Sequence, residues 1–125
     1  MPINTKFEIK EKYVLITSEG ERNNFAAVIE GTNLMYEIIE KTQCSLVLLD
    51  YRKVIFNVPQ TDAFNIIRLY ELKMPRLTNI RIAAWLANLN PGFTTVWKDV
   101  AKSKGFQFET FLNLKDAEEW LLIKP

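Results

Sequence analysis

The chain has 125 residues, of which 48% are hydrophobic and 25% are charged, and its net charge is +1. This size and composition are typical of one globular domain, which we place over residues 1–125. A charge so close to zero argues against nucleic-acid binding through phosphate neutralisation. No apolar run approaches the ~20 residues that cross a bilayer, and the polar first ten residues lack the apolar core of a signal peptide. We therefore expect a cytoplasmic, bacterial protein without a membrane span.

The residue types that are missing exclude several kinds of chemistry. The chain has no histidine, which removes the usual nucleophile–base pairs and the imidazole metal ligands. The one cysteine, Cys44, excludes an internal disulfide and is expected to act as a small core hydrophobe. The four glycines are scattered and form no phosphate-binding loop. These absences predict no catalytic residues, no metal site and no cofactor, so we do not expect an enzyme.

The first half of the chain predicts three strands and a helix. Residues 6–10 alternate between apolar and polar, which is typical of a half-exposed edge strand, and the more apolar Tyr13–Thr17 is its predicted antiparallel neighbour. Apolar residues at three-and-four spacing predict a helix over Asn24–Lys41, where Gly31 marks a point of close packing. Ser45–Leu49 has no polar face and therefore predicts a strand that is buried on both sides.

The chain continues with a helix and a second central strand. The apolar face of residues 61–73 predicts a helix with Thr61 or Gln60 as its N-cap. Asn79–Ala87 is apolar on both faces from Ile82 onward, which indicates another central strand.

The last part of the chain predicts a helix, an edge strand and a final helix. The third helix opens at Asn90 and Pro91 and ends at Gly105. Phe106–Phe111 alternates as an edge strand does, and Asn113 caps the last helix. The order β-β-α-β-α-β-α-β-α predicts an α/β fold. Its single-helix crossovers require a mostly parallel open sheet, with the N-terminal edge strand antiparallel.

The first candidate site follows the central strand, because ligands meet parallel sheets at the carboxyl ends of their strands. After Leu49 the chain breaks into charge, and a loop of about eight residues is predicted to run to Thr61. In one interpretation Arg52 binds a carboxylate or phosphate, Tyr51 forms a lid and Asp50 is an anchor. In the other, Asp50 hydrogen-bonds neighbouring loop backbone, and Arg52 is either solvated or paired with Asp50.

The order of elements, the strand Val47–Asp50 and the final segment Phe111–Leu121 resemble the STAS domain of anti-sigma-factor antagonists. That domain belongs to the SpoIIAA-like group, which also contains Sec14-like domains, and the resemblance covers nearly the whole chain. In switch-type members the loop after the central strand ends in Asp-Ser-Ser-Gly, and a kinase that phosphorylates one serine breaks partner binding. Here Asn57 falls near the aspartate, both serines and the glycine are missing, and Thr61 is the nearest hydroxyl.

The resemblance implies two functions. The first is a protein-interaction or regulatory module without the usual phosphoacceptor serine, whose loops Asp50–Thr61 and Asn88–Phe93, including Asn90, dock a protein partner. A second copy of the chain is an alternative partner, because a homodimer would cover an apolar sheet face left open by the helices. The second function is a Sec14-like domain that binds a small anionic or apolar ligand, such as a lipid, in a closed apolar pocket with a polar mouth near Arg52.

Two further patterns leave alternatives open. Residues 68–104 contain seven basic and two acidic residues, and they either face an acidic protein or anionic head group or form the solvated sides of helices. The aromatic residues either line a ligand cavity or belong to the core; these are Tyr70, Trp85, Phe93 and Trp97.

Overall fold

In the computed structural model, which describes residues 4–88 and 92–123, five strands form one sheet in the order β1-β2-β3-β4-β5. β1 is antiparallel to β2, and every later pair of neighbours is parallel. This confirms the predicted α/β architecture and its antiparallel N-terminal edge strand. The strands are β1 (Asn4–Ile9), β2 (Val14–Arg22), β3 (Leu46–Phe56), β4 (Arg81–Trp85) and β5 (Gln107–Phe111).

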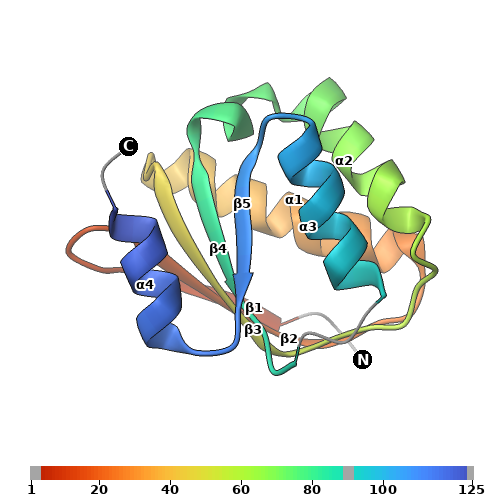
Figure 1. Ribbon diagram of the computed structural model, residues 1–125, viewed down its shortest axis with the longest axis horizontal. Coiled ribbons are helices and arrows are strands. Elements are labelled where there is room, and N and C mark those ends of the chain that lie inside the picture. Colours follow the sequence, from red (N-terminus) through yellow and green to blue (C-terminus); the bar gives the residue numbers. More distant parts are fainter. Residues whose placement is uncertain (1–3, 89–91, 124–125) are drawn as a thin grey trace.

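The helices cover the two faces of the sheet unequally. Figure 1 shows α1, α2 and α3 on one face and α4 alone on the other. None of the helices in the described ranges is long and apolar enough to traverse a membrane. The helices are α1 (Phe25–Thr42), α2 (Asp62–Lys73), the short 3₁₀ helix η1 (Pro75–Asn79), α3 (Phe93–Ser103) and α4 (Leu114–Leu122).

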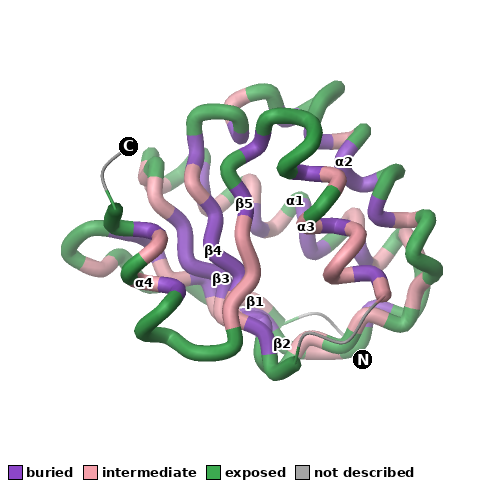
Figure 2. Tube along the Cα trace, in the orientation of Figure 1, coloured by how far each residue is buried: buried purple, intermediate pink, exposed green. Residues whose placement is uncertain are grey.

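The central strands are buried on both faces, as predicted (Figure 2). Val47 and Leu49 point into the core under α1, α2 and α3, whereas Leu48 points into a second core with Ala117 and Leu121 of α4. α4 therefore already covers β3 and β4 on the face that we expected a second copy to cover. The reason for expecting a homodimer, an apolar sheet face left open by the helices, therefore no longer applies.

β3 corrects the sequence analysis most strongly, because it continues from Leu46 to Phe56 where a loop was expected after Leu49. The second half of β3 pairs in parallel with the second half of β2, and the last pair in this register is Arg22 opposite Phe56. The charged residues that suggested a loop lie on the solvated side of this ribbon, while Tyr51 and Phe56 pack toward the three-helix core. The actual connection to α2 is only residues 57–61.

The predicted helix caps have different outcomes. The Asn113 side chain accepts a hydrogen bond from the first turn of α4, as expected, and the Asn24 side chain does the same for α1. Thr61 occupies the N-cap position of α2, but its side chain makes no capping hydrogen bond. The turn begins earlier, because the carbonyls of Pro59 and Gln60 already accept the Asp62 and Ala63 N–H groups. Asn90 and Pro91 lie outside the described residues.

Candidate functional site

The two faces of β3 separate the residues that were expected to form one polar site. Tyr51 is only 3% exposed and lies on the three-helix side. Asp50 and Arg52 line a groove on the opposite side of the sheet. Because neighbouring residues of a strand point to opposite faces, Tyr51 cannot act as a lid over Arg52.

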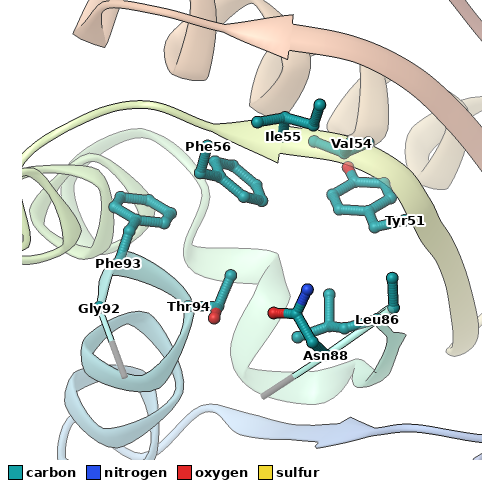
Figure 3. Close-up of a pocket in the computed structure, with 10 residues that line it drawn as sticks. Tyr51, Val54, Ile55, Phe56, Leu86, Asn88, Gly92, Phe93 and Thr94 are labelled. Atoms are coloured by element: carbon teal, nitrogen blue, oxygen red, sulfur yellow. The ribbon is translucent and has the colours of Figure 1, made fainter. Parts of the chain in front are cut away.

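A pocket of about 260 Å³, the end pocket, opens at the carboxyl ends of β3 and β4 (Figure 3). It lies where sequence reasoning placed function, but most of its lining residues are aromatic or aliphatic. Its lining residues are Tyr51, Val54, Ile55 and Phe56 of β3, Leu86, Ala87 and Asn88 after β4, and Gly92, Phe93 and Thr94 at the start of α3.

Stacked aromatic rings form the inner wall of the end pocket. The Phe56 and Phe93 rings stack with centroids 4.7 Å apart, and Tyr51 stacks on Trp97 at 6.3 Å. The Trp97 indole N–H donates to the buried Tyr70 hydroxyl, 3.0 Å away. Tyr70, Phe93 and Trp97 therefore belong to the core, and Phe93 also reaches the pocket wall.

Sequence reasoning missed Arg22, a buried cation behind this wall. It is 2% exposed, and its Cζ lies 4.8 Å from the Tyr51 ring centroid and 5.2 Å from that of Phe56. Its Nη2 donates to the Ser18 hydroxyl, whereas its buried Nε has no hydrogen-bond partner among the described residues. Gly31 of α1 provides the space, since a Cβ there would lie 2.5 Å from the Arg22 Cζ. In the sequence, the only signal of this close contact was Gly31 in the interior of a predicted helix.

On the opposite face, Arg52 is held by two neighbours. Its Nε and Nη2 each donate to a different oxygen of the Asp50 carboxylate at 2.9 Å. Its Cζ also lies 3.6 Å from the Trp85 ring centroid, which is a close cation–π contact. The hydrogen bond from Arg52 is the main reason why the pKa of Asp50 is lowered. The pairing of Asp50 with Arg52 is the second of the two interpretations predicted from the sequence.

The remaining predicted site residues do not line the end pocket. The Asn57 amide donates to the Asn23 side chain at 2.7 Å, and its backbone N–H donates to the Arg22 carbonyl, so Asn57 joins two loops. Thr61 is exposed at the start of α2. Asn90 lies outside the described residues. The polar mouth near Arg52 is also wrong for this pocket, because Arg52 lies on the other face of the sheet.

The basic segment 68–104 does not act as one charged surface. Arg76 pairs with Glu40 at 2.8 Å, and Lys102 pairs with Glu109 at 2.8 Å. Arg81 donates to the carbonyls of residues 120 and 123, where it closes the end of α4. Several of these basic side chains are therefore engaged in ion pairs or hydrogen bonds within the fold.

Comparisons with known proteins identify the fold. No protein-family model and no curated protein matches the sequence. Among solved structures, an uncharacterised DUF3478-family protein with a SpoIIAA-like fold from Shewanella loihica aligns with a TM-score of 0.56 and 16% identity over 95% of this chain and 93% of its own. An anti-sigma factor antagonist from Mycobacterium paratuberculosis aligns with a TM-score of 0.59 and 16% identity, over 96% and 94%. The chain therefore has the SpoIIAA-like fold that its sequence resembles.

Proposed function

We propose that this chain is a non-enzymatic, regulatory protein-interaction module that docks a protein partner at the end pocket. The observation that carries the proposal is an open pocket with an aromatic wall at the carboxyl ends of two parallel strands. Ile55 lines this pocket and is 51% exposed, so it extends the apolar wall to the protein surface, where a partner could contact it.

The size of the end pocket favours a protein side chain as its occupant. Small-molecule sites usually enclose about 300–1,000 Å³, and this pocket measures about 260 Å³ and opens to solvent. One apolar side chain of a partner would fit, and anchors of this kind account for most of the energy of protein interfaces. The Mycobacterium paratuberculosis neighbour is described as an antagonist of an anti-sigma factor, and thus of another protein.

The outer side of α2 extends the proposed docking surface. Phe64 and Leu72 are 56% and 68% exposed, and Arg68 lies between them at helical spacing. α2 begins six residues after the last residue of β3, so its first turn, with Phe64, lies at the same end of the sheet as the end pocket, and Arg68 and Leu72 follow one and two turns further along the helix. We define the docking surface as the end pocket together with these three residues.

The proposed module works without a serine switch. The segment that follows β3 is Asn57–Thr61 and contains no serine. Partner binding is therefore expected to be set by the amounts of the two proteins and not by a phosphoserine in this loop. Mass spectrometry of the protein from its native cell should find residues 57–61 unmodified. Stoichiometric phosphate on Thr61 would contradict this part of the proposal.

A comparative pull-down from the native cell tests the docking surface. We expect the wild type to retain a partner that Ile55→Asp loses, because a carboxylate on the rim would have to be desolvated in the complex. Ile123→Asp is the matched control, since Ile123 is similarly exposed, at 59%, but follows α4. Equal capture by both variants would refute this surface, as would loss of the partner with Ile123→Asp alone.

A further inference from the structure

A polar groove of about 460 Å³, the sheet-face groove, lies on the side of the sheet opposite the end pocket. β1, β2 and β3 form its base. The strand register arranges most of its lining residues in two rows across these strands, one of Asn4, Glu19 and Lys53 and one of Lys6, Thr17 and Asp50. Arg52 lies beside the second row.

A β-bulge gives the groove its positive charge. The β2–β3 register shifts between Thr17 and Glu19, so that β3 has one more residue than β2 at this point. As a result Arg52 and Lys53 both line the groove, whereas strict alternation would send one of them to the other face. Tyr51 and Val54, on either side of this pair, line the end pocket.

The cationic side chains of the groove offer hydrogen-bond donors to a ligand. Both oxygens of the Asp50 carboxylate accept from Arg52, and one oxygen of Glu19 accepts from the Asn4 amide at 3.0 Å. Neither Lys6 nor Lys53 has a carboxylate within ion-pair distance among residues 4–88 and 92–123. A guanidinium has five N–H groups, and Asp50 uses only the side formed by Nε and Nη2. The outer edge of Arg52, formed by Nη1 and Nη2, remains available.

Arg52 is also held in position before any ligand arrives. The Asp50 carboxylate fixes one edge of the guanidinium, and the Trp85 ring lies against its plane. A held arginine loses less conformational entropy on binding than a mobile one. Its planar outer edge matches two oxygens of a carboxylate or phosphate.

We propose that the sheet-face groove binds a small organic anion, either a carboxylate or a phosphate compound. Its anionic group contacts the outer edge of Arg52 and the Lys53 ammonium, and the remainder extends over Thr17 toward Lys6. The groove volume falls in the range of sites for small molecules. The site lies on the other face of the sheet from the docking surface, so it does not depend on the proposed protein interaction.

Amide NMR titration of the whole chain with pyrophosphate and, separately, with citrate tests this site. Sodium chloride at equal ionic strength controls for screening. We expect saturable shifts at Lys6, Thr17, Arg52 and Lys53, and the tighter of the two probes distinguishes a phosphate site from a carboxylate site. Absence of saturable shifts with both probes would overturn the proposal.

Three substitutions show whether the groove binds by charge alone. Arg52→Lys keeps the charge but removes the planar edge, and it should weaken binding about tenfold. Lys53→Gln should weaken binding about threefold, and it provides the test if Arg52→Lys does not fold. Lys104→Gln removes an exposed charge outside the groove and should leave binding unchanged.

Binding that is equally strong in Arg52→Lys and in wild type, or equally weak in Lys53→Gln and Lys104→Gln, would refute this assignment. Ile55→Asp should bind the probes normally, which separates failure of this site from failure of the docking surface.

Discussion

The side chains on the two faces of β3 leave different chemical groups accessible to a ligand or partner. On the three-helix side, Tyr51 and Phe56 join a wall of packed rings, and the end pocket exposes apolar surface at its rim. On the side of α4, Asp50, Arg52 and Lys53 line a groove in which Lys6 and Lys53 have no carboxylate partner among the described residues. One strand with one bulge thus offers two different chemistries, apolar contact on one face and anion binding on the other.

The largest expected effect tests the ring wall of the end pocket. Trp97 contacts the rings of Tyr51, Phe56, Phe93 and Phe108 and is almost fully buried. Trp97→Ala should lower the free energy of unfolding by about 3–5 kcal/mol, because it leaves a cavity in the core. Urea denaturation measures the change. A loss below about 1 kcal/mol would show that the pocket wall is not continuous with the core, which would break the comparison between the faces.

The α4 face has its own pH-dependent contact, between the Tyr13 hydroxyl and a Glu118 carboxylate oxygen. Burial, with help from this hydrogen bond, raises the pKa of Tyr13 to about 12 from an ordinary value near 10. Between these values the folded chain holds more protons than the unfolded chain, so the free energy of unfolding falls as pH rises. The contribution is complete below about pH 10 and lost by about pH 12, and we expect it to be about 2 kcal/mol, because the hydroxyl is only partly buried and solvent screens it.

Comparison with Tyr13→Phe isolates this effect from other alkaline titrations, including that of the buried Tyr70, whose pKa is also raised. Wild type should be the more stable protein at pH 8, and the difference should shrink steadily from pH 10 to pH 12. Denaturation curves at fixed pH measure it. A difference that stays constant across this range would mean that Tyr13 titrates normally.

The sequence predicted the order of elements along the chain, both central strands and the Asn113 cap, because each depends on local periodicity or a short capping motif. It failed over the second half of β3, from Asp50 to Phe56. Charged residues at 50, 52 and 53 resemble a loop, and the bulge removes the alternation by which a strand is recognised. Because of that one error, residues predicted to form one site lie in three places: Tyr51 in the end pocket, Asp50 and Arg52 in the sheet-face groove, and Asn57 in the loop.

Arg22 shows why the rest of the site could not be predicted from the sequence. In sequence it stands between a glutamate and two asparagines, a polar setting that indicates a loop. Its burial depends on Gly31 from α1 and on two rings from β3, which no local pattern connects. A buried cation of this kind becomes visible only once the tertiary contacts are known.

The smallest expected effect concerns Gly31 and links α1 to the end pocket. Alanine is favoured over glycine within a helix by about 1 kcal/mol, so Gly31→Ala would stabilise an unconstrained helix. Here the new Cβ would meet the Arg22 guanidinium carbon at 2.5 Å and push the cation off the Tyr51 and Phe56 rings. We therefore expect Gly31→Ala to destabilise the protein by about 1–2 kcal/mol, since overpacking outweighs helix propensity.

The sign should reverse once the guanidinium is gone. In an Arg22→Ala background, Gly31→Ala should raise the free energy of unfolding by about 0.5–1 kcal/mol, because only the helix preference remains. A double-mutant cycle by urea denaturation measures this coupling. Additive effects of the two substitutions would mean that α1 does not hold Arg22 against the pocket rings, and that the end pocket is shaped by β3 and α3 alone.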